Sequence, residues 1–327
     1  MKKFKLFALF LLSFVLLGLV GCDDGRIKIG ILQYVSHDAL DAAREGIIEG
    51  LKNNGYDTDK VEFLVYNPQA EKTALSSMSK EILRKSDMVI AIATPAAVSV
   101  VAEAKNNKID KPILFTAVTD PVDANLVDSN ENPGGNVTGT SDMNPVNEQI
   151  ELALELMPEV KKIGIVYTSS EINSQIQVNM AINKAQELGI TVETATITST
   201  NDVSQITRNL ITSKNIDLLY LPTDNLVSSS MSTITEITEE LNIPTVCGEA
   251  AMVEKGGLVT LGIDYKELGI LTGEMAAKIL SGEKTPATYP VQRLEEFELV
   301  INKTQAEKIG FSIPSSLLSR ASKVIEE

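Results

Sequence analysis

From Arg26 onward, short apolar runs rich in β-branched residues alternate with longer amphipathic segments. The runs at 27–33 and 61–66 have the length of buried strands, and residues 38–53 between them follow a helical pattern that ends at Asn54-Gly55. Strands that alternate with helices are typical of parallel βαβ units. We therefore predict an α/β fold.

The same alternation continues along the chain and restarts once. In the first half we expect strands at 27–33, 61–66, 87–93 and 112–115 and helices at 38–53, 70–84 and 95–106. A small-residue segment at 136–140 is suited to cross between two bodies. Beyond it we expect helices at 145–156, 172–188, 202–214, 226–241 and 265–280, strands at 162–167, 191–195, 217–221, 244–246, 257–263 and 297–301, and a terminal helix from 304. The pattern predicts two doubly wound parallel-sheet lobes joined by a multi-strand hinge.

This organisation assigns each part of the chain to a lobe. We expect residues 22–140 with about 264–290 in the first lobe, and 141–263 with about 291–327 in the second. Two lobes on a hinge form a cleft that opens and closes around a ligand. Such a protein needs no catalytic group.

The N-terminus reads as an export signal, assigned to residues 1–21. Lysines at the start precede an apolar block at 7–17, which is too short for a membrane span, and then Leu19-Val20-Gly21-Cys22. That last run resembles a bacterial lipobox, which implies that Cys22 is the lipidated first residue of the mature protein. A plain signal peptide with an incidental cysteine is the alternative.

The charge of the chain excludes one class of partner. The formal net charge is −15, and without residues 1–21, which carry three lysines and no acid, it becomes −18. So acidic a chain is a poor partner for nucleic acid or for anionic membrane surfaces. We expect no nucleic-acid partner.

Residues that carry catalysis are scarce. No phosphate-binding loop or G-x-G-x-x-G fingerprint is present, and His37 is the only histidine. With Cys22 lipidated, Cys247 is a single thiol, which excludes a disulfide. We therefore expect no enzyme, metal or cofactor. A two-lobed racemase or lyase that uses Cys247 is one alternative.

Polar residues gather where the predicted strands end, which is where ligands bind in open parallel sheets. The candidates for ligand binding are Gln33, Tyr34, His37, Thr94, Pro95, Thr116, Ala117, Asp120, Ser141, Asp142, Tyr167, Ser174, Asp224, Asn225, Glu249 and Asp264. Many of them could equally cap helices, and that alternative stays open.

Two kinds of ligand group fit these candidates. The Thr94 hydroxyl and the free amides of the helix that starts at Pro95 could hold an anion such as a carboxylate. A buried carboxylate without a partner is costly, so Asp142, Asp224 or Glu249 would favour an ammonium group.

Several stretches together resemble the ABC-transporter substrate-binding lipoproteins whose characterised members include tryptophan- and phenylalanine-binding proteins. They are IGILQYVSHDALD, IATPAA, ILFTAVTDPVDANLV, NPGGNVTGTSD, PTDN and GIDYKELGILTGEMAAKILSGE. The resemblance spans nearly the whole mature chain. It implies a type I periplasmic-binding-protein fold and an extracytoplasmic, lipid-anchored protein that delivers a small molecule to a permease and its ATPase.

The resemblance also implies an amino-acid ligand, with an aromatic one favoured. Its ring would stack on Tyr34, Phe115, Tyr167 or Tyr265. One departure is Ala93, where the family often has glycine. A lipoprotein that presents its ligand to a membrane signalling receptor would have the same fold and anchor, and is the second alternative.

Overall fold

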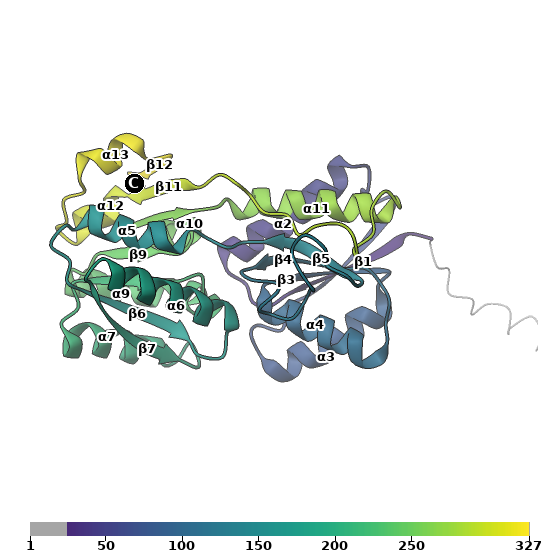
Figure 1. Cartoon of the computed structure of the whole chain (residues 1–327), viewed down its shortest axis with the longest axis horizontal. Helices are drawn as coiled ribbons and strands as arrows, with labels where there is room; N and C mark the ends of the chain where they lie inside the picture. Colours follow the sequence, from purple (N-terminus) through teal and green to yellow (C-terminus); the bar gives the residue numbers. More distant parts are fainter. Residues whose placement is uncertain (1–24, 327) are drawn as a thin grey trace, which may run out of the picture.

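Residues 25–326 of the computed structural model form two α/β lobes that lie side by side (Figure 1). The first lobe contains an all-parallel sheet of order β2-β1-β3-β4-β5. Its strands are β1 (Ile27–Gln33), β2 (Val61–Tyr66), β3 (Met88–Ile92), β4 (Ile113–Val118) and β5 (Val137–Ser141). This order reverses direction beside β1 and β3, as in doubly wound folds.

Four helices cover this sheet, two on each face (Figure 1). They are α2 (Asp38–Asn53), α3 (Lys72–Lys85), α4 (Thr94–Asn107) and α11 (Tyr265–Leu280). The strands β3 and β4 are buried along their whole length, which explains their continuous apolar runs.

Helices α2 and α11 cross closely because each carries a pair of glycines four residues apart. Gly46 and Gly50 of α2 face Gly269 and Gly273 of α11. A Cβ at Gly269 would overlap the carbonyl oxygen of Ala43. The crossing therefore fixes α11, which is remote in sequence, on the first lobe.

The second lobe contains a seven-stranded sheet of order β12-β11-β10-β9-β8-β6-β7. Its strands are β6 (Lys162–Thr168), β7 (Thr191–Ile197), β8 (Leu218–Leu221), β9 (Thr245–Cys247), β10 (Val259–Gly262), β11 (Glu298–Asn302) and β12 (Lys323–Ile325). Its helices are α5 (Val146–Leu156), α6 (Ile172–Glu187), α7 (Val203–Lys214), α8 (Asn225–Ser229), α9 (Met231–Leu241), α10 (Ala250–Glu254), α12 (Lys303–Lys308) and α13 (Ser315–Arg320).

The predicted α/β class with two parallel-sheet lobes is confirmed, with local corrections. Strand β11 runs antiparallel to β10, so the second sheet is not wholly parallel. The helix expected at 226–241 is two helices that meet at Ser230. The segment at 136–140, expected only as a crossing, is the edge strand β5.

Within residues 25–326 the chain passes between the lobes three times. The first passage follows β5, the second joins β10 to α11, and the third leads into β11. Gln292, on the third passage, pairs with β5 through bonds to Gly139 and Ser141 before the chain enters the second sheet. Parallel connecting segments of this kind form a hinge.

Candidate functional site

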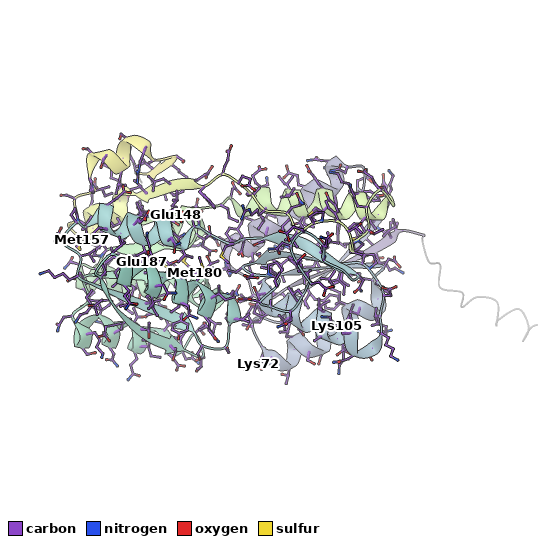
Figure 2. All side chains as sticks on the ribbon, viewed as in Figure 1. Lys72, Lys105, Glu148, Met157, Met180 and Glu187 are labelled. Carbon is purple, nitrogen blue, oxygen red and sulfur yellow. The ribbon has the colours of Figure 1, made fainter. Side chains whose placement is uncertain are left out.

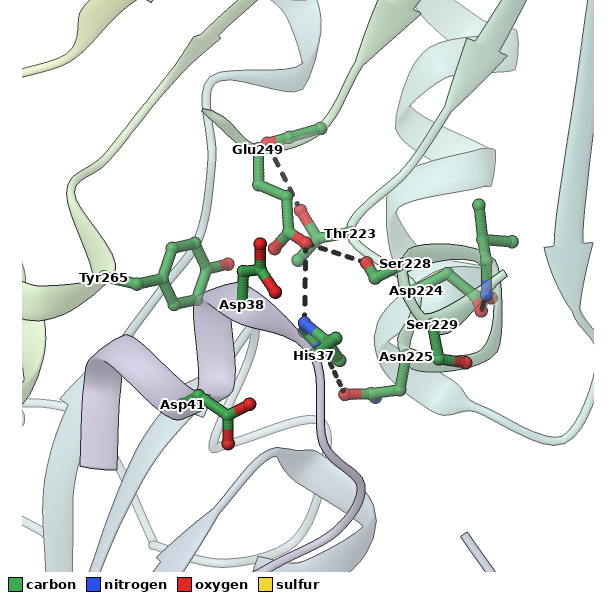
Figure 3. Close-up of polar contacts among 12 residues, drawn as sticks. His37, Asp38, Asp41, Thr223, Asp224, Asn225, Ser228, Ser229, Glu249 and Tyr265 are labelled. Carbon is green, nitrogen blue, oxygen red and sulfur yellow. Dashed lines mark hydrogen bonds and ion pairs between the residues drawn. The ribbon is translucent and has the colours of Figure 1, made fainter. Parts of the chain in front are cut away.

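A small cavity lies between the lobes at the carboxyl ends of the strands. Its volume is about 10 Å³, room for about one water molecule. The side chains around it come from both lobes and from the hinge: His37, Leu40, Ala117, Thr119, Asp142, Asn173, Thr223, Asp224, Asn225, Ser228, Glu249 and Tyr265. Figure 3 labels seven of them, His37, Thr223, Asp224, Asn225, Ser228, Glu249 and Tyr265. A second pocket of about 210 Å³ shares His37, Ser228 and Glu249 with this cavity.

Four carboxyl groups are buried in or beside this cavity. Asp142, Glu171, Asp224 and Glu249 are each 1–3% exposed. No lysine or arginine within residues 25–326 is buried, and charged side chains such as Lys72, Lys105 and Glu148 lie on the outside (Figure 2). Uncompensated burial of acids is costly, so the cleft favours a cation.

Asp224 accepts the most hydrogen bonds of the four acids. It accepts from the amide and hydroxyl of Thr168 at 2.6 and 2.8 Å, from Ser174 Oγ at 2.6 Å and from the amide of Val227 at 3.0 Å. Asp224 therefore connects β6, α6 and the start of α8 through hydrogen bonds.

Glu171 precedes α6 and has one satisfied and one unsatisfied oxygen. Oε2 accepts from Asn225 Nδ2 at 2.5 Å and from Asn173 Nδ2 at 3.1 Å, whereas Oε1 is buried without a partner. Burial, and then the nearby charge of Asp224, raises the pKa of Glu171 to about 8.

Glu249 faces His37 across the cleft (Figure 3). Its Oε1 accepts from Ser228 Oγ at 2.8 Å and lies 3.9 Å from His37 Nδ1, and its Oε2 has no partner. Burial raises the pKa of Glu249 to about 7 and lowers the pKa of His37 to about 4. At neutral pH the imidazole is uncharged, so it does not neutralise the acid.

Asp142 is held at the hinge by donors from two directions. Tyr265 OH donates to Oδ2 at 2.7 Å and Thr119 Oγ1 donates to Oδ1 at 3.2 Å. Thr119 also accepts from Gln177 Nε2 of the second lobe at 3.3 Å. Burial raises the pKa of Asp142 to about 6.

In the first lobe, α4 begins at the edge of the sheet that faces the cleft. Its first residue, Thr94, is 3% exposed and has a buried hydroxyl without a partner. The preceding Ala93 has φ 81° and ψ 150°, a conformation that glycine adopts far more easily. The first lobe therefore carries an unpaired hydroxyl at the start of α4, after the carboxyl end of β3.

The structure brings six of the sixteen sequence candidates to the cavity. His37, Ala117, Asp142, Asp224, Asn225 and Glu249 line it. Tyr34 is buried close enough to Glu171 for that acid, after burial itself, to raise the Tyr34 pKa to about 12. Thr94 and Pro95 stand at the start of α4 and do not line the cavity.

Other candidates do not line the cavity and make their hydrogen bonds elsewhere. Gln33 bonds to Val35, Asp41 and Arg44. Thr116 accepts from Thr140, which in turn bonds to Thr272 of α11, because a bulge with Ala117 at φ 54° turns the strand there. Asp264 is exposed and caps α11.

The remaining candidates serve the hinge or the second lobe. Asp120 caps a turn at Val122, and Ser141 donates to the carbonyl of Thr119. Ser174 donates to Asp224. Tyr167 is half-buried against the core of the second lobe and does not line the cavity, and the Phe115 ring is fully buried in the core of the first lobe.

The ligand-binding candidates from the sequence did not include Asn173, which lines the cavity, or Glu171, which bonds to Asn173 beside it. Both follow β6 directly, so their place after a strand was a usable signal. Glutamate is not a preferred cap, and that mismatch at the start of a helix could have drawn attention to Glu171.

Other chemistry is absent from the described part of the chain. Residues 25–326 contain no group of three or more His, Cys, Asp or Glu placed to hold a metal. Burial raises the pKa of the Cys247 thiol to about 12, so it is not a ready nucleophile. None of the helices in 25–326 combines the length and apolarity of a membrane span. Cys22 lies outside the described residues.

Residues 28–325 match the family described as ABC transporter substrate binding protein. The chain belongs to that family. Members of it are extracytoplasmic solute-binding proteins and not enzymes. The chain is 42% identical to the tyrosine-binding protein of Clostridioides difficile (strain R20291), over 84% of this chain and 79% of the relative.

Two solved structures show which conformation the chain adopts. A Streptococcus pneumoniae protein in complex with L-Trp is 39% identical, with a TM-score of 0.86 over 92% of this chain and 100% of that one. A ligand-free, open substrate-binding protein with adhesive properties from Clostridium difficile is also 39% identical, with the same coverage but a TM-score of only 0.68. At equal identity, the lobes here are arranged more like those of the complex.

Contacts across the cleft agree with a closed arrangement. His37 Nε2 lies 3.5 Å from Asn225 Oδ1, and Lys255 Nζ lies 3.0 Å from Asp38 Oδ2. Since the cavity between them holds about 10 Å³, a ligand enters only when the lobes separate.

Proposed function

We propose that the protein captures an amino acid, with aromatic ones preferred, by closing its two lobes, and delivers it to the permease and ATPase of an ABC importer. The observation that carries the proposal is the set of four buried carboxyl groups in a cleft without a buried lysine or arginine. A ligand ammonium group would supply the missing charge.

The distribution of unpaired atoms supports one orientation of the ligand. The second lobe offers acceptors, Glu171 Oε1, Asn173 Oδ1 and Glu249 Oε2, whereas the first lobe offers the Thr94 hydroxyl at the start of α4. The ammonium group would therefore face the second lobe and the carboxylate the first.

The aromatic preference rests on two tyrosines and on relatives. Both tyrosines are buried, Tyr265 lines the cavity (Figure 3), and Tyr34 lies near Glu171 and Asp224, so their rings would pack against an aromatic ligand. A relative is named for tyrosine and a structural neighbour holds L-Trp.

The proposal includes the lobe boundaries and the anchor expected from the sequence. Residues 22–140 with 264–290 would move against 141–263 with 291–327. Cys22 would carry lipid that holds the protein at the outer face of the cell membrane. Replacing Cys22 by serine should release the protein from the membrane fraction, whereas a soluble parent protein would contradict the anchor.

A thermal-shift and calorimetric screen tests the ligand. Residues 23–327 would be screened against the twenty amino acids, sugars and nucleosides, since a ligand at 100 times its Kd adds about 2.7 kcal/mol of stability. We expect stabilisation by tyrosine, tryptophan or phenylalanine and none by their N-acetyl derivatives. Stabilisation only by sugars or nucleosides would overturn the proposal.

A pair of matched variants tests the orientation. Thr94→Val keeps the side-chain shape and removes the hydroxyl, so amino-acid affinity should fall about 10-fold, the value of one hydrogen bond of about 1.4 kcal/mol. Thr207→Val removes another buried hydroxyl without a partner, on α7 away from the cleft, and should leave affinity unchanged. Equal effects would contradict the assignment of Thr94.

A further inference from the structure

Gln177 of α6 is fully buried, and its amide group makes hydrogen bonds to both lobes. Its Oε1 accepts from the backbone amide of Thr223 at 2.9 Å, within the second lobe. Its Nε2 donates to Thr119 Oγ1 at 3.3 Å, and Thr119 directly follows β4 of the first sheet. One side chain therefore spans the boundary between the lobes.

Thr119 is tied to the hinge by two further hydrogen bonds. Its hydroxyl donates to Asp142 Oδ1 at 3.2 Å, and its carbonyl accepts from Ser141 Oγ at 2.9 Å. Ser141 ends β5, and Asp142 begins the first passage between the lobes. A contact made by Thr119 therefore acts directly on the hinge.

Gln177 acts through its partners, since it is not among the side chains around the cavity. Thr119 and Thr223 both line the cavity, one from each lobe. Thr223 directly precedes Asp224 and Asn225, two further residues of the cavity wall. The Gln177 amide thus sets the spacing between two walls of the cavity.

Burial distinguishes this contact from the ion pair at the outside of the cleft. The side chains of Lys255 and Asp38 are about half exposed. Thr119 and Gln177 are instead 2% and 0% exposed. Without the Gln177 amide, closure would remove the Thr119 hydroxyl from water with one partner fewer, which disfavours the closed arrangement.

We propose that Gln177 is a positioning residue that holds the lobes closed, through a hydrogen bond to Thr119 that forms only on closure. The inference rests on the proposed function. A ligand first binds to the open form, where this bond does not exist, so Gln177 does not affect the association rate. Release requires the lobes to separate and the bond to break, so Gln177 slows dissociation.

Two fluorescent dyes would report the separation of the lobes. They are attached to Lys72→Cys on α3 and Glu187→Cys on α6, two exposed positions on different lobes (Figure 2). Residues 23–327 contain one other cysteine, Cys247, which is buried. Energy transfer between the dyes then follows closure during stopped-flow mixing with L-tyrosine, L-tryptophan or L-phenylalanine.

The variant Gln177→Met removes the amide group at nearly constant side-chain length. It should raise the dissociation rate about 10-fold and leave the association rate within about two-fold of the parent. Gln149→Met is the matched control, because Gln149 is also a fully buried glutamine on a helix of the second lobe. Its bonds go to Gly248, Leu261 and Tyr220, all in that lobe. This control should lower the melting temperature without changing either rate.

A double-mutant cycle isolates the bond itself, because Gln177→Met also removes the acceptor of the Thr223 amide. Thr119→Val keeps the side-chain shape and removes the hydroxyl, so it should raise Kd about 10-fold, as Gln177→Met does. The double variant should lose well under about 100-fold in affinity, since both changes break the same contact. A full loss of about 100-fold would mean that the two residues act independently, and would overturn the inference.

The outcomes separate this inference from the proposed function. If one of the three amino acids binds but Gln177→Met releases it at the parental rate, the inference is overturned and the proposed function stands. If none of them binds, the proposed function fails, and the labelled protein without ligand decides the inference. Its closed fraction should then be lower in Gln177→Met than in Gln149→Met, and equal fractions would overturn the inference.

Discussion

Tyr265 donates a 2.7 Å hydrogen bond to Oδ2 of Asp142, and both side chains are buried. Asp142 follows β5 on the first passage between the lobes, and Tyr265 begins α11 directly after the second. The bond therefore joins two hinge segments beside the cavity between the lobes.

Tyr265→Phe should weaken this connection with almost no change in shape. Asp142 Oδ2 would lose its donor while remaining buried, so the free energy of unfolding should fall by about 1–3 kcal/mol. Urea denaturation measures the change, with Tyr167→Phe on the second lobe as the control. Equal stability of parent and Tyr265→Phe would show that solvent replaces the bond.

The empty protein should lose stability as pH rises from 6.5 to 8. Burial raises the pKa of Glu171 to about 8 and that of Glu249 to about 7, from an ordinary 4.5. A folded state that binds protons more tightly is most stable at low pH and loses that contribution as pH rises through the folded-state values.

The contribution of His37 to stability changes with pH in the opposite direction, and it does so in another pH range. Its pKa is lowered from 6.5 to about 4, so its contribution is lost only as pH falls below 6.5. Between pH 6.5 and 8 the acids alone decide the trend. Melting temperatures measured across that range without ligand should decline; a flat or rising profile would contradict the raised values.

Ala93→Gly should stabilise the protein. The backbone at Ala93, with φ 81° and ψ 150°, lies in a region that costs a non-glycine residue about 1–3 kcal/mol. The greater freedom of glycine in the unfolded chain offsets up to about 1 kcal/mol of this relief. We expect a net gain of about 1 kcal/mol in chemical denaturation.

Ala96→Gly is the matched control for Ala93→Gly. It lies inside the same helix with ordinary helical geometry, so it should destabilise by about 1 kcal/mol. If both changes destabilise equally, Ala93 carries no strain that glycine relieves.

Gly269→Ala should destabilise the first lobe by several kcal/mol. The added methyl would overlap the carbonyl oxygen of Ala43, so α11 and α2 would have to separate. Gly135→Ala, where nothing lies within 4 Å of the new Cβ, should be nearly neutral. Equal melting temperatures for the two variants would show that the crossing of α2 and α11 has space for a methyl group at Gly269.

The ion pair between Lys255 and Asp38 should contribute little to closure. Its nitrogen and oxygen lie 3.0 Å apart across the cleft, but the side chains are 51% and 48% exposed. Exposed pairs are worth about 0–1 kcal/mol, so Lys255→Met should change ligand affinity less than five-fold. A larger loss of ligand affinity, measured by calorimetry, would show that this ion pair contributes substantially to the stability of the closed form.

The alternation of apolar runs predicted most elements because strand and helix periods are local. The bounds of β1, β2, α2 and α11 agree with the prediction residue for residue. The prediction missed short elements such as α10, because five residues are too few to show a helical period. The strand β11 was predicted, but its antiparallel direction was not, because strand direction depends on the path of the long connection before it.

Strand-end position predicted the region of the site but not the direction of each side chain. Thr116 was expected in the cleft, yet the bulge at Ala117 turns its hydroxyl toward Thr140, 24 residues away. Asp224 and Glu171 both follow strands, and only the network of donors around each shows that one is saturated and the other is not.

The sequence by itself determined the α/β class and the acidic character, since these depend on composition and local period. Only the tertiary structure decided which acids are buried together and which oxygens lack a donor. Burial and hydrogen bonding are properties of neighbours: Asn225 reaches Glu171 over 54 positions, and His37 reaches Asn225 over 188. No local pattern records such pairs, because the residues become neighbours only in the folded protein.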